Sequence, residues 1–442
     1  MRVTSREGSG TKVIGVIADD VTGANDIGIM FAKSSYLTHV FGYDLESGWR
    51  PDHEKKPDVV VLDTDSRLDQ ADVAYDKVFQ ATKNFQEAGA SRFFNKTCSV
   101  FRGNIGAEFD AMLDALKEEF AVVILGFPKN GRTTVDGIHY VHGRRLEDSE
   151  FRNDPVHPME RSDLVGILQS QTKRKVGLVD QSVVKSGAES IRVRLAELKR
   201  SLQYAIIDVT RQEDLAVIAE AVQDEKILCG SSALAEELPK VWGKRKNVSQ
   251  QRVLQPYNGK GLLCVAGSLM PQTAEQIDYM RGGQAAVLEF DTVDLAGMEN
   301  PEVKIRDTVS EILPILNDGT DVIFHTANSP DKVKATKEAG FAKGLSNEEI
   351  SRLVSGTMAE IAAEIMQHSG QNRLLVAGGD TSGAVCKRLG IKGMRVCEEI
   401  APGLPSCISL SGQPVALVLK SGSFGQSDFL EKAFSHLKSL SV

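Results

Sequence analysis

Short apolar runs alternate with longer amphipathic segments along almost the whole chain, and this pattern limits the fold more than any other feature. Each apolar run has the length of a buried strand. Strand, helix and strand at this spacing predict right-handed βαβ units and a parallel sheet. In the first half we expect strands at residues 13–17, 37–41, 59–63, 92–95, 122–126, 176–179 and 204–208, with helices such as 71–88 and 105–120 between them.

A second series of strands is expected at residues 261–265, 285–289, 321–325, 373–377 and 415–419. A chain of 442 residues is long enough for two or three domains. The segment 240–260, between the two series, is polar and turn-rich, as is typical of a domain boundary. We therefore predict two α/β domains with largely parallel sheets and a cleft between them, at residues 11–245 and 255–442.

The composition argues against several classes of protein. The net charge of -8 disfavours nucleic acid as the main partner. The longest apolar runs are strand length, and residues 1–12 contain no apolar core, so we expect neither a membrane span nor a secretory signal. Six cysteines without a C-x-x-C pair favour reduced thiols in a cytoplasmic enzyme over a disulfide or zinc framework.

The first predicted strand runs directly into Asp19 and Asp20. Open α/β sheets bind ligands beyond the carboxyl ends of their strands. Two adjacent carboxylates there lose solvation and repel each other, so they usually bind a cation, a hydroxyl or backbone donors. Gly23 and the apolar run 27–31 indicate that a helix follows at once. The alternative is therefore that one of these acids only caps that helix.

Three further strand tips in the first half carry cations and hydroxyls. The tip at 63–67 ends in Arg67, which could clamp a carboxylate. The tip at 95–104 carries Lys96 and Arg102 and precedes a helix, whose free N–H groups favour an anion. The tip at 126–134 adds Lys129 and Arg132. Together these tips predict a crevice for a small polyhydroxylated acid.

Three glycine-rich turns follow strands in the second half, at residues 267–273, 378–385 and 420–425. Glycines let the backbone approach a phosphate closely, and the start of the helix after residue 378 adds N–H groups and a favourable dipole. Asp380 could help to hold Mg²⁺ beside a triphosphate. The chain has no P-loop motif, and no G-x-G-x-x-G follows a strand. The three turns together favour a nucleotide site of another kind.

These motifs resemble those of the four-carbon acid sugar kinase family. Residues 17–24 read I-A-D-D-V-T-G-A, residues 96–104 read K-T-C-S-V-F-R-G-N, and residues 130–133 read N-G-R-T. In the second half, residues 378–383 read G-G-D-T-S-G, residues 401–405 read A-P-G-L-P, and residues 419–425 read L-K-S-G-S-F-G. The similarity spans nearly the whole chain, in the order of the family.

The resemblance implies an N-terminal domain that binds a tetronate and a C-terminal domain that binds ATP with Mg²⁺. The activity that it implies is phosphorylation of the terminal (4-) hydroxyl of a four-carbon acid sugar. The implied substrate-binding residues are Asp19, Arg67, Lys96, Thr97, Cys98, Ser99, Arg102, Asn104 and Arg132. The implied residues around ATP are Ser268, Gly378, Gly379, Asp380, Thr381, Ser382, Lys420 and Gly422, with Asp380 on the metal.

A mechanism follows as a hypothesis, because phosphoryl transfer mainly requires positioning and charge neutralisation. Arg67 and the loop 96–99 would hold the carboxylate and hydroxyls of the sugar. Asp19 or Asp20 would orient the terminal hydroxyl and accept its proton. Lys420 and the glycine turns would cradle the phosphates. The two domains would have to close on each other, since each binds one substrate.

The substrate could come from either of two branches of the family. Many members read K-x-D-S-T-L-R-G-N where this chain has Cys98 in place of the acid. The compact loop 99–102 looks more like the threonate/erythronate branch, so we predict D-threonate or D-erythronate. The alternative is a 3-oxo-tetronate.

Other classes of protein fit less well. A non-catalytic, two-lobed sugar-acid binding protein would explain the crevice but not the three glycine turns. A dehydrogenase would need a dinucleotide fingerprint, and a carboxylate ligase would need a second acceptor. Cys98 could be a nucleophile beside Lys96, but a small apolar thiol is the simpler role. We expect an acid sugar and ATP as partners, without nucleic acid or membrane, and leave a homodimer open.

Overall fold

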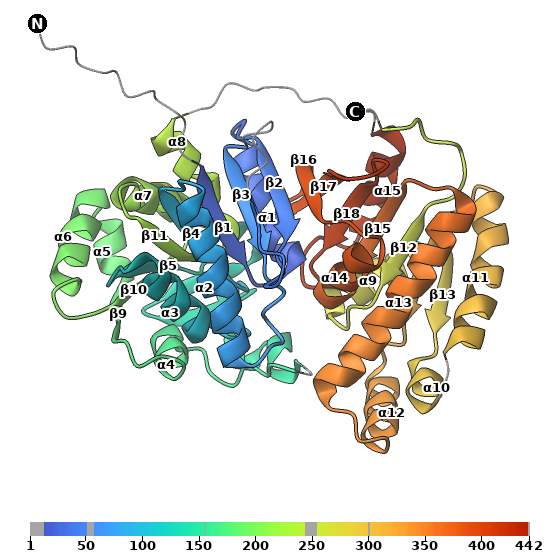
Figure 1. Ribbon diagram of the computed structural model, residues 1–442. Helices are drawn as coiled ribbons and strands as arrows, with labels where there is room; N and C mark the ends of the chain where they lie inside the picture. The colour runs from blue at the N-terminus through green and yellow to red at the C-terminus, as the bar shows by residue number, and fades with distance from the viewer. Residues whose placement is uncertain (1–12, 51–56, 155, 244–253, 299–300, 441–442) are drawn as a thin grey trace, which may run out of the picture.

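The computed structural model describes residues 13–50, 57–154, 156–243, 254–298 and 301–440. It confirms the predicted fold class, since two α/β halves lie side by side (Figure 1). Within the described ranges, no helix is both long enough and apolar enough to cross a membrane. Of the predicted boundary segment 240–260, residues 244–253 lie outside the described residues. Residues 1–12, in which we expected no secretory signal, also lie outside them. The predicted domain limits stay a prediction.

The N-terminal half contributes a block of parallel strands to the main sheet. Apolar runs rich in Val, Ile and Phe form these strands, as is typical of strands buried on both faces. Outward from the middle of the molecule, their order is β2 (Thr38–Gly42), β3 (Val59–Asp63), β1 (Ile14–Ala18), β4 (Arg92–Lys96), β11 (Ile227–Gly230), β5 (Ala121–Ile124), β10 (Tyr204–Ile207) and β9 (Val176–Val179).

The C-terminal half continues the same sheet. From the outer edge inward, its order is β13 (Ala286–Phe290), β14 (Val322–Thr326), β12 (Leu263–Ala266), β15 (Arg373–Ala377), β18 (Ala416–Lys420), β17 (Leu404–Ser409) and β16 (Gly393–Ala401). The first five strands are parallel, whereas β16 and β17 form an antiparallel hairpin. The sequence pattern did not predict this hairpin, nor β11.

The two halves share one continuous sheet because β16 pairs with β2, through Gly393 with Phe41 and Met394 with Val40. The pairings of β2 with β16, β16 with β17 and β17 with β18 are all antiparallel, so the two parallel blocks run in opposite directions. Six pairings separate β1 from β15. A twist of 20–25° at each pairing adds up to roughly 120–150°, which turns the carboxyl ends of the two blocks toward each other.

Helices cover both faces of this sheet, and one cluster of buried hydrophobic residues extends across both halves. The N-terminal half carries α1 (Val21–Ala32), α2 (Ala71–Glu87), α3 (Ile105–Leu116), α4 (Leu164–Gln169), α5 (Gln181–Lys185), α6 (Ala188–Leu198), α7 (Gln212–Val222) and α8 (Leu238–Trp242). The C-terminal half carries α9 (Pro271–Arg281), α10 (Thr292–Gly297), α11 (Glu302–Asn317), α12 (Pro330–Phe341), α13 (Asn347–Ser369), α14 (Gly379–Arg388) and α15 (Phe429–Ser439).

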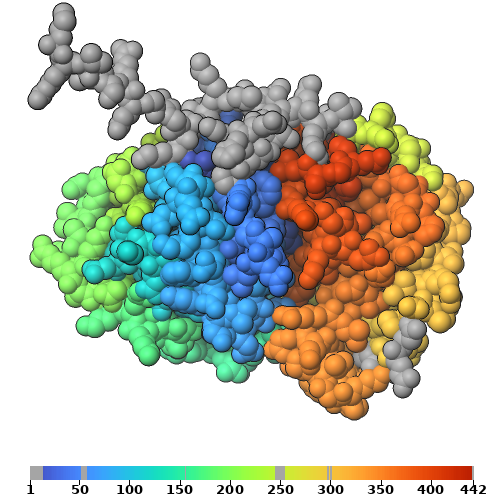
Figure 2. All heavy atoms as spheres, viewed as in Figure 1, coloured from blue at the N-terminus to red at the C-terminus, as the bar shows by residue number. Residues whose placement is uncertain are grey.

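A smaller antiparallel sheet lies between β5 and α4 in the chain. It consists of β6 (Arg132–Val135), β7 (Ile138–Val141) and β8 (Arg144–Arg145), followed by single helical turns at Leu146–Asp148 and Glu150–Asn153. This insertion matters for the site, because the chain directly after it reaches the C-terminal half. In the space-filling view the two halves are in contact along their shared boundary (Figure 2).

Candidate active site

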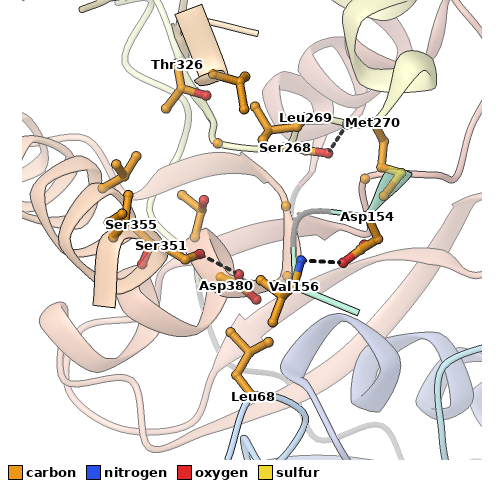
Figure 3. Close-up of a pocket in the computed structure, with 18 of the residues that line it drawn as sticks. Leu68, Asp154, Val156, Ser268, Leu269, Met270, Thr326, Ser351, Ser355 and Asp380 are labelled. Atoms are coloured by element: carbon orange, nitrogen blue, oxygen red, sulfur yellow. Dashed lines mark hydrogen bonds between the residues drawn. The ribbon is translucent and has the colours of Figure 1, made fainter. Parts of the chain in front are cut away.

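A cavity lies between the two halves, where the strand tips of both blocks meet (Figure 3). It holds about 1260 Å³ of space outside the protein atoms and opens to solvent. The N-terminal half lines it with Asp20, Arg67, Leu68, Arg102, Asp154, Val156 and His157. Of the residues predicted around ATP, it is lined by Ser268, Gly378, Gly379, Asp380, Thr381 and Gly422.

Arg67 holds the two acids at the tip of β1. Its Nε and Nη2 donate to the two carboxylate oxygens of Asp19, at 2.8 and 2.7 Å. Its Nη1 donates to Oδ2 of Asp20 at 2.7 Å. Both acids are buried, at 1% and 7% exposed. The bidentate clamp expected of Arg67 is therefore made to Asp19 within the protein.

Asp20 also caps α1, which was the alternative for one of these acids. Its Oδ1 accepts the backbone N–H of Gly23 at 2.7 Å, and its Oδ2 accepts the hydroxyl of Thr22 at 2.8 Å. Burial alone would raise the pKa of Asp20, but the charges of Arg67 and Lys96 outweigh it and lower the pKa. Asp20 is thus ionised and lines the cavity, so capping and a site role coexist in one side chain.

Lys96, at the end of β4, is buried beside Asp26 of α1. Its Nζ lies 3.6 Å from Oδ2 of Asp26 and donates to the carbonyl of Thr97 at 3.0 Å. The hydroxyl of Ser232 donates to the other oxygen of Asp26 at 2.7 Å. Burial raises the pKa of Asp26 to about 6, against the opposing effect of Lys96. This ion pair lies beneath the cavity and does not line it.

Cys98 is a buried thiol between two guanidinium groups. Nε of Arg102 donates to its sulfur at 3.3 Å. Burial raises the pKa of the thiol, but the charges of Arg102 and Arg67 outweigh that effect and lower it. Neighbouring cations favour the thiolate, which is the reactive form of a cysteine. Cys98 is nevertheless 6% exposed and does not line the cavity, so a structural role fits this geometry.

Several predicted substrate residues lie away from the cavity wall. Asn104 donates from Nδ2 to the carbonyls of Ser66 and Asp69, at 3.0 and 2.8 Å, and so fixes the loop that carries Arg67. Arg132 is 1% exposed and lies between the aromatic rings of Phe151 and Phe424, so it bridges the two halves. Five more of the predicted substrate residues do not line the cavity: Asp19, Lys96, Thr97, Cys98 and Ser99.

The glycine-rich turns of the C-terminal half pack against one another. A side chain at Gly422 would lie 2.1 Å from Oγ of Ser268, so only glycine permits this approach. Ser268 in turn accepts the backbone N–H of Met270 at 3.2 Å (Figure 3). The turn at residues 378–385 leads into α14, whose first N–H groups have no partner within the helix. This surface of backbone donors suits an anion.

Lys420 and Ser382 do not lie where the sequence analysis placed them. Nζ of Lys420 donates to Oγ1 of Thr273 at 2.8 Å and to the carbonyls of Ser421 and Gly422, at 2.9 and 3.0 Å. These bonds occupy all three of its protons, and the side chain is fully buried. It supports the turn from below and is not part of the cavity wall. Ser382 is likewise buried in α14, outside that wall.

The two halves touch where Asp20 meets the start of α14. A side chain at Gly379 would lie 2.8 Å from Oδ2 of Asp20. The acid tip of β1 and the glycine turn after β15 are therefore in direct contact across the boundary. A group bound at this turn would lie beside a group bound at Asp20, as transfer between two substrates requires.

The residues present fit a metal ion that is held mainly by phosphates. Asp380 lines the cavity, and Ser351 of α13 donates to its Oδ2 at 3.1 Å, which leaves its other oxygen for a ligand. Desolvation of the Asp65 carboxyl raises its pKa to about 6 against the charge of Lys77, and the charge of nearby Asp380 adds to this rise. Among the described residues, no three acids, histidines or cysteines cluster tightly enough to hold a metal alone.

The sequence analysis missed part of the cavity wall. Asp154, Val156 and His157 follow the small inserted sheet, and Thr326, Ser351 and Ser355 come from β14 and α13 (Figure 3). None of the first three belongs to a strand tip, so the pattern that identified the other residues could not identify them. The D-P-V-H sequence at 154–157 indicates only a turn.

Known proteins with similar sequences and structures identify the two halves. The model of a sugar-binding N-terminal domain matches residues 14–238, and that of a nucleotide-binding C-terminal domain matches residues 263–430. A 3-oxo-tetronate kinase of Pseudomonas savastanoi pv. phaseolicola is 33% identical over 438 residues, 96% of this chain and 97% of that protein. The 3-oxo-tetronate kinase of Haemophilus influenzae is 31% identical over 428 residues, 95% and 99% of the two chains.

Two solved structures share the fold over nearly the whole chain. A crystal structure described as a putative tRNA synthase from Salmonella typhimurium LT2 has a TM-score of 0.76 at 29% identity and covers 95% of this chain and 98% of its own. A Haemophilus influenzae structure has a TM-score of 0.67 at 30% identity, covering 96% and 100%. The chain therefore belongs to the four-carbon acid sugar kinase family, and it is an ATP-dependent carbohydrate kinase with a sugar-binding and a nucleotide-binding domain.

Proposed function

We propose that this kinase transfers the terminal phosphoryl group of ATP to the 4-hydroxyl of a four-carbon acid sugar. The observation that carries the proposal is the contact between Asp20 and the turn at Gly379, because it joins the acid tip of one domain to the anion-binding turn of the other. ATP would lie along Ser268, Gly378 to Thr381 and Gly422, with its phosphates on the start of α14.

Asp20 is the acid that we assign to the reacting hydroxyl. It lines the cavity, whereas Asp19 is fixed by two hydrogen bonds to Arg67 and does not. Asp20 would orient the hydroxyl and accept its proton as the phosphoryl group leaves ATP. Its low pKa is compatible with this role, because a loose phosphoryl-transfer transition state depends more on positioning than on a strong base.

The acid sugar would lie on the N-terminal wall. Arg67 keeps donors beyond the three hydrogen bonds to Asp19 and Asp20, and these could reach a substrate carboxylate. The segment Lys96 to Ser99, with Asn104 and Arg132, would form and support the floor of this site. Asp380 would hold Mg²⁺, which supplies charge neutralisation at the phosphates.

Two classes of acid sugar are candidate substrates. Relatives at 30–33% identity over at least 95% of the chain carry the name 3-oxo-tetronate kinase, which makes a 3-oxo-tetronate the first candidate. The compact loop 99–102 favours D-threonate or D-erythronate as the second. A cytoplasmic location and a homodimer stay predictions from the sequence.

A screen of ATP consumption over both threonates, both erythronates and the 3-oxo-tetronates tests the proposal. We expect turnover with one class of acid and little with the others. A control without sugar measures background hydrolysis of ATP. Turnover with none of these acids would refute the substrate assignment, while stabilisation by Mg-ATP alone would still support the nucleotide site.

A further inference from the structure

Arg102 lines the cavity shared with the glycine turns, but it belongs to the sugar-binding domain. It lies in the loop between β4 and α3, where the side chains of Val100 and Phe101 are buried, at 0% and 1% exposed. These two apolar anchors fix the loop in the core. The side chain of Arg102 is left on the cavity side, opposite the turns of the nucleotide-binding domain.

Three groups hold the guanidinium of Arg102 in place. Nη1 donates to Oδ2 of Asp154 at 2.6 Å, Nε donates to Sγ of Cys98 at 3.3 Å, and Cζ lies 5.2 Å from the centre of the Phe151 ring. Among the described residues, its Nη2 has no hydrogen-bond partner. The side chain is therefore oriented on one side and keeps donors for a ligand on the other.

Asp154 is itself fixed by the backbone. Its Oδ1 accepts the N–H groups of Val156 and His157, at 3.1 and 2.8 Å (Figure 3). Burial would raise the pKa of Asp154, but Arg102 and these N–H groups outweigh it and lower the pKa. An ionised, rigid carboxylate thus sets the direction of Arg102.

The other cations near the glycine turns are placed differently from Arg102. Arg67 is paired with both acids at the tip of β1, and Lys420 is buried beneath its turn. Lys337 lines the cavity from α12, within the nucleotide-binding domain. A donor on the sugar side of the cleft would stabilise the charge on the phosphoryl group as it leaves the nucleotide-binding domain.

We infer that Arg102 contacts the phosphoryl group during transfer and that Asp154 is the residue that positions it. This inference rests on the proposed function. The bond between the γ-phosphorus and the bridging oxygen of ATP breaks, a bond to the sugar oxygen forms, and the hydroxyl proton goes to Asp20. Arg102 stays protonated throughout and donates to the non-bridging oxygens.

The test compares Arg102→Ala, Arg102→Lys and Asp154→Asn with the wild-type enzyme. We expect kcat to fall about 10²- to 10³-fold in Arg102→Ala, with the KM of the acid sugar nearly unchanged. Guanidinium salt at millimolar concentration should restore part of the activity of Arg102→Ala. Asp154→Asn should lower kcat roughly 10- to 100-fold through misplacement of the guanidinium. Asp154→Glu, which keeps the carboxylate, should recover part of this loss.

Two surface variants serve as controls. Arg145→Ala and Asp148→Asn remove the same charges from exposed positions of the same domain and should leave kcat unchanged. A second readout is the binding of ADP, by calorimetry, with and without aluminium fluoride. The wild type should bind ADP more tightly when aluminium fluoride is present. Arg102→Ala and Arg102→Lys should lose this gain but bind ADP alone normally.

Two results would overturn the inference. One is a raised KM for the acid sugar with unchanged kcat in Arg102→Ala, which would make Arg102 a sugar-binding residue. The other is an undiminished gain from aluminium fluoride in both Arg102 variants. The calorimetric readout requires no turnover of sugar, so it judges Arg102 even if the screen of acids refutes the proposed substrate.

Discussion

The two acids at the tip of β1 show how neighbouring residues of one type come to differ. Both carboxylate oxygens of Asp19 accept hydrogen bonds from Arg67. Asp20 accepts one hydrogen bond from Arg67 and one from the backbone N–H of Gly23, and it still lines the cavity. The sequence placed both acids at a strand tip but could not separate them. The two acids differ because Arg67 donates two hydrogen bonds to Asp19 and one to Asp20. Arg67 is 48 residues from Asp19 and 47 from Asp20 in the chain, so no local pattern shows this.

Asp20→Asn should therefore remove the charge at the reacting hydroxyl and keep the fold. Asparagine can still accept the N–H of Gly23, so the cap of α1 persists. We expect kcat to fall by about 10² to 10⁴, with a melting temperature close to that of the wild type. Steady-state kinetics and a thermal melt measure both quantities. Near wild-type turnover in Asp20→Asn would refute the assignment of the base to Asp20, and the same result in Asp19→Asn as well would exclude both acids.

Glu108 of α3 should make the stability of the protein depend on pH. It is 1% exposed and accepts the hydroxyl of Ser66 at 2.7 Å. Burial raises its pKa to about 8, from an ordinary value of 4.5. The folded state thus retains a proton that the unfolded state loses, so stability falls between about pH 4.5 and 8, by up to ~1.4 kcal/mol per pH unit.

Glu108→Gln should remove this contribution, because the amide can accept the same hydroxyl without ionising. Urea denaturation at pH 5, 6, 7 and 8 is the measurement. We expect the wild-type free energy of unfolding to decline across this range and that of the variant to decline less. Parallel curves for the two proteins would contradict the role given to Glu108.

At the scale of elements, α14 combines an anion-binding start with an ordinary helical body. Gly379, in its first turn, touches Asp20 across the domain boundary, whereas Gly383, one turn later, has open space where a side chain would lie. The sequence predicted both the helix and its glycine turn. It could not show that one glycine faces another domain, because that contact comes from the packing of distant elements.

Replacing glycine by alanine should impair catalysis at position 379 but not at position 383. Gly379→Ala would place a methyl group 2.8 Å from Oδ2 of Asp20, so we expect a loss of kcat of at least tenfold, through a displacement of about an ångström at the reacting groups. Gly383→Ala should keep kcat and stabilise α14 by roughly 0.5–1 kcal/mol. Kinetics and thermal melts of both variants decide this. Equal kinetics would show that the close contact does not matter.

The predicted strands are present in the structure where the local hydrophobic pattern is strong. The strands at 59–63, 92–95 and 373–377 are present as β3, β4 and β15, because buried parallel strands read as short apolar runs. The strand at 176–179 is present as β9, at the edge of the sheet. The hairpin β16–β17 was missed because β16 mixes acids with apolar residues and carries irregular pairing between Val396 and Ala401. Helix α3 ends at Leu116, short of the predicted residue 120, because Lys117 adopts a left-handed conformation.

At the scale of the whole molecule, the continuous sheet couples the two domains. The pairing of β16 with β2 and one shared buried cluster join the two halves, while a second buried cluster lies within the N-terminal half. Lys33 of α1 also forms an ion pair with Glu399 of β16, at 2.8 Å. We therefore expect one cooperative unfolding transition for the whole chain.

Differential scanning calorimetry tests this coupling. A single transition should appear, and a non-hydrolysable ATP analogue, which would bind only the C-terminal domain, should shift it as one peak to higher temperature. Unfolding followed by a label in the N-terminal domain should show the same shift. Two transitions, of which only one responds to the nucleotide, would mean that the domains unfold independently.

The sequence by itself determined the two series of βαβ units, the polar strand tips and the glycine turns, because each depends on residues that are neighbours in the chain. The tertiary structure decided which of these residues share a cavity. Asp20, Arg102 and Gly379 share a cavity because the twist of the continuous sheet brings the tips of β1, β4 and β15 to one place. It also buried Lys96, which lies 3.6 Å from Asp26, and Lys420, which donates to one hydroxyl and two carbonyls. Because removing a cation from water costs free energy, burial lowers the pKa of Lys420 to about 7.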